Sequence, residues 1–316
     1  MSAATRIAPW LLMAVALVLR LYRLADYTVF QGDQGIDALA ARRLVVEHVW
    51  PLEGPATSAG GVHLGPLYYY VLALPMLLGS FDPVHQAALV AVLGAAAVGL
   101  LYWLAFEWFG FWPAVIAAGL FAVAPAAIVA TRSAWNPAPA PFFLLLALLA
   151  LARCHRTCDG RWLLLTGVGL GALIQFHYFT VGVVLVGVGG IVYEAFRIRR
   201  SGAAWALLSL LALVALLSPL LVHEVRDGFP NVQAARALAV EAPAQPSERA
   251  PRRLYEVLAL GLVGGFLTAG FEAVAVLLSL VLLVGLAVRR GYGQALIVLA
   301  LLASALQALA YRGPIF

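Results

Sequence analysis

Two acidic residues stand close together in the segment 30–42, directly after the first apolar stretch of the chain. Asp33 follows Gly32 and is predicted to cap a helix that runs to about Val49. Asp37 lies four residues later, a spacing that places both carboxylates on one face of that helix. Such a helix could simply lie on a membrane surface, or it could hold an acid at the membrane edge for chemistry. We favour the second interpretation because the chain has the composition of a membrane protein and places further polar residues at the ends of its apolar segments.

The composition is that of a membrane protein. Of the 316 residues, 64% are hydrophobic and only 11% are charged. A soluble domain with this balance would expose large apolar patches to water. We therefore predict an all-α polytopic membrane protein with one transmembrane domain over residues 1–316. All 20 basic residues are arginines, placed beside apolar segments, so the formal charge of +5 reflects membrane topology and not nucleic-acid binding.

The two cysteines, Cys154 and Cys158, lie beside His155. Structural zinc sites need four ligands at defined spacings. Two thiols and one imidazole fall short of that set, so we predict no metal site here.

Nine apolar segments are predicted to span the membrane, because each is near the length that the hydrocarbon core requires. They are residues 7–24, 84–108, 111–130, 137–152, 162–178, 181–196, 203–222, 271–288 and 294–310. Residues 63–79 are apolar but short, and Pro66 and Pro75 interrupt them. We expect this segment and the acidic helix to be interfacial helices in a loop over residues 25–83. A second polar loop is predicted over residues 223–253, followed by a glycine-rich, partly interfacial stretch at 254–266.

The arginines predict the orientation. If residues 63–79 do not span, three short arginine-containing loops fall on the same side as the N-terminus. These loops contain Arg153, Arg156, Arg161, Arg197, Arg199, Arg200, Arg289 and Arg290. The N-terminus is then cytoplasmic and the 25–83 loop is extracytoplasmic, in the inner membrane. Arg20 and Arg23 are exceptions at the outer end of the first span, where we expect them to snorkel or to pair with lipid phosphate.

With this orientation, a set of polar residues gathers at the outer ends of the segments. They are Asp33, Asp37, His63, Arg132, Asn136, His177, His223 and Glu224. Each alone has an ordinary explanation, such as an interface anchor or a helix start. Polar groups at membrane depth are nevertheless functional candidates. Together they predict a polar crevice that opens outward at the headgroup level.

The residue types of this crevice suit a transfer from a lipid phosphate. The sequence has no zinc-protease helix, Walker loop, nucleophile elbow or dinucleotide motif. A lipid phosphate leaves without a proton donor, so one carboxylate suffices as general base on the acceptor hydroxyl, while cations stabilise the phosphate. A hydrolase would need a second, differently tuned carboxyl. Asp37 could play that part, so the residues leave this alternative open.

Four short motifs, in order, resemble bacterial members of glycosyltransferase family 39, relatives of protein O-mannosyltransferases and of the lipid A aminoarabinose transferase in the GT-C superfamily. They are GDQGIDAL at 32–39, GPATS at 54–58, LGPLYYY at 64–70 and SAWNP at 133–137. The resemblance implies a GT-C-type bundle, a polyprenyl-phosphate sugar donor and an active site outside the cytoplasmic membrane.

The resemblance also implies residue roles. Asp33 matches the family's catalytic aspartate and is expected to be the general base. Gln34 stands where the family often has a second acid, so the acidic pair that could hold a metal ion is incomplete here. A divalent metal cofactor stays open as an alternative. The residues expected to bind donor or acceptor are Gln34, Asp37, His63, Tyr69, Arg132, Asn136, His177, His223 and Glu224.

We therefore expect a membrane glycosyltransferase that moves a sugar from a polyprenyl-phosphate donor to a glycan, lipid or protein acceptor. Family members usually run longer, so we expect this chain to be shortened at its C-terminus. Three alternatives stay open. The chain could be a non-catalytic fragment that binds a lipid carrier, a flippase or transporter of lipid-linked sugars, or a phosphoethanolamine or acyl transferase. A flippase would predict polar residues deep within several spans.

Overall fold

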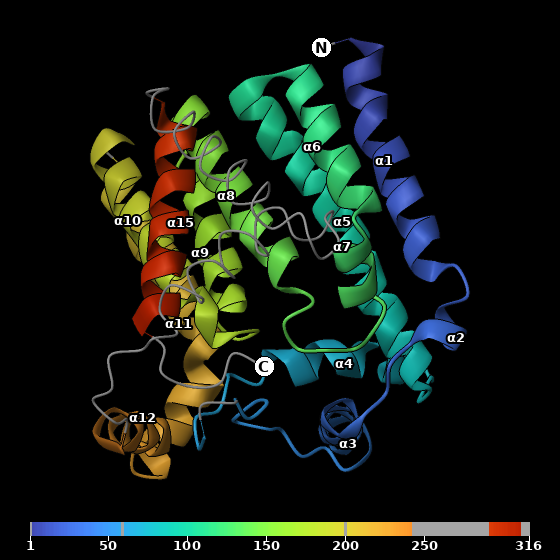
Figure 1. Cartoon of the computed structure of the whole chain (residues 1–316). Coiled ribbons are helices and arrows are strands. Elements are labelled where there is room, and N and C mark those ends of the chain that lie inside the picture. The colour runs from blue at the N-terminus through green and yellow to red at the C-terminus, as the bar shows by residue number, and fades with distance from the viewer. Residues whose placement is uncertain (1, 58–59, 199–200, 242–290, 311–316) are drawn as a thin grey trace.

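The computed structural model describes residues 2–57, 60–198, 201–241 and 291–310, and these residues form an all-α polytopic membrane fold (Figure 1). The main bundle consists of α1 (Ala3–Leu21), α5 (Pro83–Phe109), α6 (Phe111–Val123), α7 (Pro125–Ala130), α8 (Ala140–Thr157), α9 (Arg161–Leu173), α10 (Val181–Ile198), α11 (Gly202–Arg226) and α15 (Tyr292–Ala310). Five helices of the described part are long and apolar enough to cross a membrane, namely α1, α5, α8, α11, and α10 together with the preceding 3-10 turn η1 (Tyr178–Thr180).

Close packing of small residues holds the bundle together. The α1, α5 and α6 helices share a core that is rich in alanine, including Ala16, Ala95 and Ala118. The α9 and α11 helices touch through their backbones, because a Cβ added at Gly167 would lie 2.1 Å from the main-chain oxygen of Ser209. In a membrane such close approach supplies much of the packing energy between helices.

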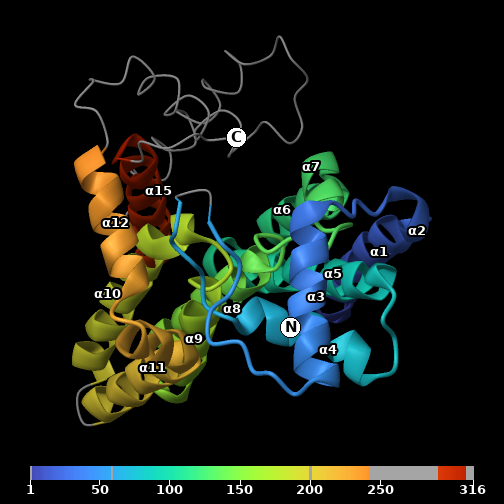
Figure 2. The ribbon, with the colours of Figure 1, turned by 90° about the horizontal axis from the view of Figure 1, so that it is seen from below.

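Four further helices lie at one end of the bundle, which we call the α3 end. They are α2 (Leu24–Tyr27), α3 (Gly32–Val46), α4 (Leu67–Leu77) and α12 (Pro230–Glu241). Figure 1 shows α4 lying across the ends of the bundle helices, and Figure 2 shows α3 crossing α4. A buried cluster that includes Leu44, Tyr68, Leu72 and Phe176 joins α3, α4 and the loop after α9. At 11 residues, α4 is shorter than the about 20 residues that a membrane span requires.

The structure corrects several predicted helix bounds, and proline explains two of them. The predicted span 111–130 divides after Val123, because Pro125 begins the separate helix α7. The span predicted to begin at Pro137 begins instead at Ala140, since Pro139 disfavours helix in the residue before it. Residues 162–178 are helical only to Leu173.

Two predicted features at the α3 end are also wrong. Asp33 is not the helix cap: Gln31 is, and it forms a capping box with Gln34. The predicted loop 223–253 begins with the last turn of α11, and α12 follows after a turn at Gly228 with φ of 77°. The segments 254–266 and 271–288 lie outside the described residues, as do the arginines at 199, 200, 289 and 290.

The remaining arginines of the predicted loops lie as expected. The turn between α8 and α9 and the end of α10 are at the same end of the bundle as the N-terminus, opposite α3 (Figure 1). These segments contain Arg153, Arg156, Arg161 and Arg197.

Candidate functional site

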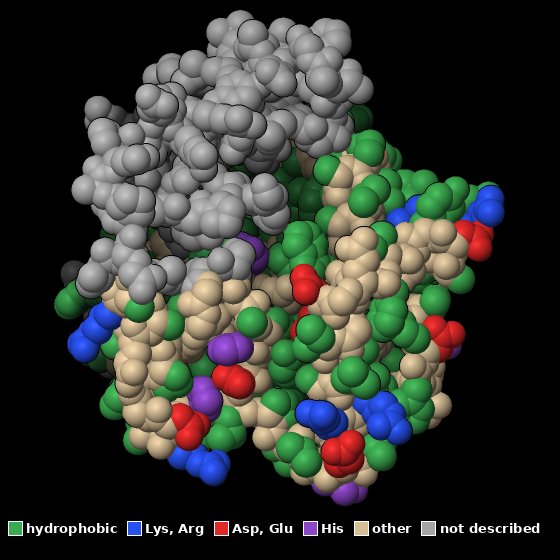
Figure 3. Space-filling view, turned by 60° about the horizontal axis from the view of Figure 1, so that its bottom comes forward, with side chains coloured by type: hydrophobic (Ala, Val, Ile, Leu, Met, Phe, Trp, Pro, Cys, Tyr) green, Lys and Arg blue, Asp and Glu red, His purple; other side chains and the backbone are tan. Residues whose placement is uncertain are grey.

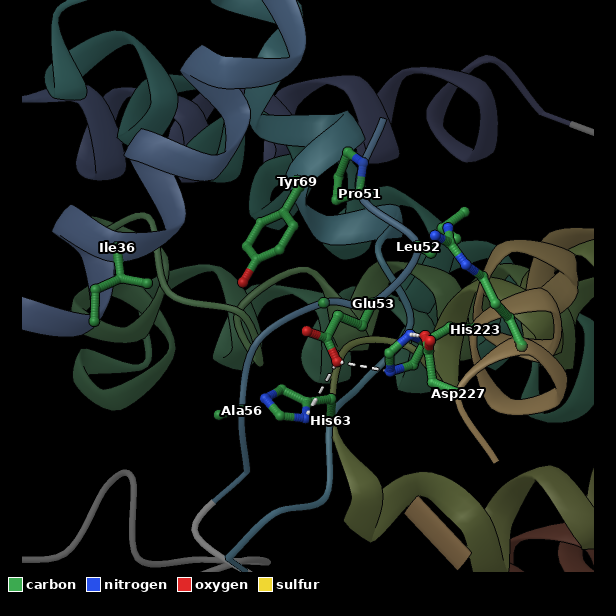
Figure 4. A pocket seen from close by; sticks show the side chains of 11 residues that line it. Ile36, Pro51, Leu52, Glu53, Ala56, His63, Tyr69, His223 and Asp227 are labelled. Carbon is green, nitrogen blue, oxygen red and sulfur yellow. Dashed lines mark ion pairs between the residues drawn. The ribbon is translucent and has the colours of Figure 1, made fainter. Parts of the chain in front are cut away.

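A pocket of about 490 Å³ opens at the α3 end, within the size range of small-molecule sites. It is lined by Ile36, Pro51, Leu52, Glu53, Gly54, Ala56, His63, Tyr69, His223, Arg226 and Asp227 (Figure 4). Its walls therefore come from α3, the connection between α3 and α4, α4 itself and the end of α11. Figure 3 shows histidine and acidic side chains gathered on this face, beside exposed hydrophobic ones.

A short hairpin forms one wall of the pocket. The Gly54 N–H donates to the main-chain oxygen of Leu64 at 2.7 Å, and the Leu64 N–H donates to that of Pro55 at 3.0 Å. Gly54 is required here, because a Cβ at this position would lie 2.1 Å from the main-chain oxygen of Gly65. The pairing brings Glu53 and His63, ten positions apart, together.

Glu53 joins the hairpin to α11. Its Oε2 lies 3.4 Å from His63 Nδ1 and 3.0 Å from His223 Nε2. The other ring nitrogen of His223, Nδ1, lies 2.7 Å from Asp227 Oδ2. One carboxylate thus orients two imidazoles at the pocket, and a second carboxylate holds the far side of one of them (Figure 4).

The α12 helix supports this wall from behind. The His63 N–H donates to Asn231 Oδ1 at 2.7 Å, and Asn231 Nδ2 donates to the His63 main-chain oxygen at 3.0 Å. The Asn231 N–H in turn donates to Glu224 Oε1 at 3.2 Å. Glu224, a predicted binding residue, is buried, and within the described residues its Oε2 has no hydrogen-bond partner. Its position links α11 to α12.

Tyr69 enters the pocket from α4. Its hydroxyl points into the cavity on the same side as Glu53 (Figure 4), and it makes a side-chain hydrogen bond with Asp37 of α3. Asp37 is only 4% exposed. Burial, with a further contribution from the nearby Asp33 carboxylate, raises the pKa of Asp37 to about 7, although the Tyr69 hydrogen bond acts in the opposite direction.

Asp33, the predicted general base, is exposed in the first turn of α3. It precedes the pocket residue Ile36 by three positions and Asp37 by four, so the three residues share one side of the helix. Asp33 itself does not line the pocket. The neighbouring Gln34 is buried, and its Oε1 accepts a hydrogen bond from the Gln31 N–H at 2.9 Å.

Arg132 is directed at the end of α1. Its Nε donates to the main-chain oxygen of Arg20 at 3.2 Å, its Nη2 donates to that of Tyr22, and its guanidinium lies 4.7 Å from the centroid of the Tyr27 ring. The prediction that Arg20 snorkels to lipid is wrong, because its side chain is fully buried. Its guanidinium donates to the Thr131 hydroxyl after α7, to the main-chain oxygen of Ala16 in α1 and to that of Ala122 near the end of α6, where the helix end leaves main-chain oxygens free.

Asn136 and His177 fix the loop after α9. Asn136 Nδ2 donates to the Phe176 main-chain oxygen at 2.9 Å, and His177 Nδ1 accepts from the Phe179 N–H at 3.1 Å. Burial lowers the pKa of His177, which favours its neutral form. Neither residue lines the pocket.

Sequence reasoning missed four residues of this site, Glu53, Arg226, Asp227 and Asn231. Two of them left a local signal. Glu53 is the single acid of the Pro/Gly-rich stretch 51–65, and Asp227 follows His223 at a spacing that places both on one helix face. Within the part of the chain that the structure describes, no group of three or more His, Cys, Asp or Glu side chains is arranged to hold a metal ion.

Comparison with known proteins agrees with a membrane transferase. No curated protein matches the chain. A family model described as dolichyl-phosphate-mannose-protein mannosyltransferase matches residues 63–223, half of the chain. The match runs from the hairpin to the last turn of α11 and so includes His63, Tyr69 and His223, while Asp33 precedes it. The chain therefore belongs to the dolichyl-phosphate-mannose-protein mannosyltransferase family, as a multi-pass membrane glycosyltransferase of the GT-C type.

Proposed function

We propose that this protein transfers a sugar from a polyprenyl-phosphate donor to an acceptor hydroxyl outside the cytoplasmic membrane, with Asp33 as general base. The observation that supports this most strongly is the position of Asp33. It is exposed on a helix that lies across the ends of the spans. It is also one turn from residues that line or contact the pocket.

The reaction needs one base and a stabilised leaving group. The Asp33 carboxylate takes the proton of the acceptor hydroxyl, and the acceptor oxygen forms a bond to the anomeric carbon of the sugar. The bond between that carbon and the phosphate oxygen breaks, and the electron pair leaves with the lipid phosphate. The phosphate leaves as an anion, so no proton donor is required.

The pocket residues divide into contacts and supports. We propose that His63, Tyr69, His223 and Arg226 contact the sugar or its phosphate, since they line the cavity and can donate hydrogen bonds. The other predicted binding residues are Gln34, Arg132, Asn136, His177 and Glu224. Their side chains bond to protein groups, and we propose that they hold the walls of the site in place.

The arginines support an orientation. Arg153, Arg156, Arg161 and Arg197 belong to segments at the end opposite α3. Cytoplasmic loops have an excess of basic residues, so we propose that the N-terminus is cytoplasmic and that the pocket faces outward from the inner membrane.

The proposal is tested by comparing cells with and without the gene. Lipid extracts and surface glycans are analysed by mass spectrometry. We expect loss of the gene to remove one sugar from a surface product and to increase one polyprenyl-phosphate sugar. Both changes should be reversed by the wild-type gene but not by the Asp33→Asn gene. Identical lipid and glycan profiles in the two strains would contradict the proposal.

A further inference from the structure

We propose that Asp37 is a positioning residue that acts through Tyr69: in its protonated form it donates to the Tyr69 hydroxyl, which is then free to donate its own hydrogen into the pocket. The identity of the ligand in the pocket rests on the proposed function. The hydrogen bond between Asp37 and Tyr69 does not depend on that function.

The surroundings of Asp37 favour a neutral carboxyl. The side chain is 4% exposed, and no ion pair found among the described residues includes it. The titratable groups that act on it are Asp33 on its own helix and Tyr69 on α4, and Asp37 in turn acts on Tyr68. A buried carboxylate with an acidic neighbour and no cation is costly. The raised pKa of Asp37, about 7, agrees with this arrangement.

The protonation state of Asp37 decides the direction of its hydrogen bond with Tyr69. An ionised carboxylate can only accept, so Tyr69 would have to donate its single hydrogen to Asp37. The Tyr69 oxygen would then present only lone pairs to the pocket, in the field of Glu53. A protonated Asp37 can donate instead, and the Tyr69 hydrogen then becomes available to the pocket. The Tyr69 hydroxyl points into that pocket (Figure 4).

A hydrogen-bond donor at this position suits an oxygen-rich, anionic ligand. A sugar phosphate presents oxygens that accept hydrogen bonds, and lone pairs of Tyr69 would repel them. We therefore infer that the pocket binds its phosphate-linked sugar best when Asp37 is protonated, at and below neutral pH. As pH rises through about 7, Asp37 loses its proton and the pocket loses one donor.

The chain offers a matched control for Tyr69 in the adjacent residue. Tyr68 is fully buried, its ring lies edge-on to Phe176 at 6.2 Å between centroids, and its hydroxyl has no hydrogen-bond partner among the described residues. Both tyrosines lie on α4 near Asp37, but the hydrogen bond to Asp37 belongs to Tyr69. Tyr68→Phe should therefore leave the relay intact, while Tyr69→Phe should remove it.

Kinetics give the first readout, with a lipid-linked sugar as the probe from about pH 6 to about pH 9. For wild type and Tyr68→Phe we expect KM to rise about tenfold across this range, the effect of losing one hydrogen bond. Asp37→Asn keeps a donor at every pH, so its KM should stay low and flat. Tyr69→Phe should show the high KM throughout. A purely structural role of Asp37 would not flatten the pH profile, and an Asp37→Asn enzyme with wild-type pH dependence would overturn the proposal.

Infrared difference spectroscopy gives the second readout and needs no turnover. The purified protein should show the carbonyl stretch of a protonated carboxyl that disappears as pH passes about 7. The band should be absent in Asp37→Asn, shifted in Tyr69→Phe and unchanged in Tyr68→Phe. If the band is still present in Asp37→Asn, the inference is wrong, whether or not the enzyme is active. A titrating band in a protein that turns over no lipid-linked sugar would instead contradict the proposed function alone.

Discussion

Arg132 and Arg20 hold each other's chain segments at the end of α1. Arg132 Nε donates to the main-chain oxygen of Arg20 at 3.2 Å, while Arg20 Nε donates to Thr131, the residue before Arg132, at 3.0 Å between Nε and Oγ1. Ser133 Oγ extends the connection to the main-chain oxygen of Val29 at 2.8 Å. The segment that leads into α3, and therefore to Asp33, is fixed by residues about 100 positions away in the sequence.

The first prediction concerns Thr131, which accepts the Arg20 hydrogen bond. Thr131→Val removes the hydroxyl with little change in shape and leaves a buried charged donor without that acceptor. An unsatisfied buried donor costs about 1–3 kcal/mol, so we expect the free energy of unfolding in detergent to fall by about that amount. Thr166→Val is the control, because Thr166 is also buried but donates only to Trp162 of its own helix, at 3.1 Å. Equal losses in the two variants would argue against the Arg20 contact.

The second prediction concerns Asn231, which binds the His63 backbone through both side-chain atoms. Asn231→Ala should detach α12 from the hairpin, and amide hydrogen exchange in the hairpin should become about tenfold faster, because two hydrogen bonds no longer oppose local opening. Gln233→Ala is the control, because the Gln233 side chain donates only to the nearby Gly228 main-chain oxygen, at 2.6 Å. Unchanged exchange in Asn231→Ala would show that α12 does not support the pocket wall.

The third prediction concerns Glu53, whose Oε2 faces both His63 and His223. Glu53→Ala leaves the two imidazoles without their shared acceptor, and hydrogen bonds to charged groups are worth about 1.5–3 kcal/mol. We expect kcat/KM for sugar transfer to fall at least about tenfold, measured with a lipid-linked sugar donor. Glu47→Ala is the matched control, since Glu47 is exposed at the end of α3. A Glu53→Ala enzyme as active as Glu47→Ala would remove the imidazoles from the proposed site.

The fourth prediction is a pH dependence of stability. The pKa of Asp37 is raised from 3.8 to about 7 in the folded protein. Its contribution to stability is therefore fully present below about pH 4 and is lost as pH rises through about 7, because the unfolded state releases the proton first. The wild-type melting temperature should fall across this window by more than that of Asp37→Asn. Parallel curves for the two proteins would contradict the burial of a neutral carboxyl at this position.

Part of the fold follows directly from local sequence. Apolar lengths predicted α1, α5, α10 and α11 to within a few residues. The segment with Pro66 and Pro75 forms a short helix, α4, in agreement with its short apolar length. The bounds failed where proline acts on neighbouring residues, as at Pro125. The residues on both sides of Pro125 favour helix, so the apolar pattern predicted one continuous span and missed the break between α6 and α7.

The site was less accessible to sequence reasoning. His63, Tyr69 and His223 line the pocket, and all three were predicted. The two histidines were found because polar residues at the ends of apolar segments are conspicuous, and Tyr69 belongs to a motif of the family resemblance. Asn231 was missed, since its contact with His63 spans 168 positions and has no local pattern. Arg20 was placed at the lipid for a similar reason: its acceptors lie on α6 and after α7, and only tertiary packing brings them to α1.

The most direct measurement is the rate of sugar transfer by Asp33→Asn at saturating polyprenyl-phosphate sugar. Asp26→Asn is the control, because Asp26 is also exposed near the end of α1 and pairs with Arg23 at 2.6 Å. If Asp33 is the general base, its variant should lose about 10²- to 10⁴-fold in kcat while donor binding and membrane insertion stay unchanged. Transfer by Asp33→Asn at the rate of Asp26→Asn would show that another group takes the proton.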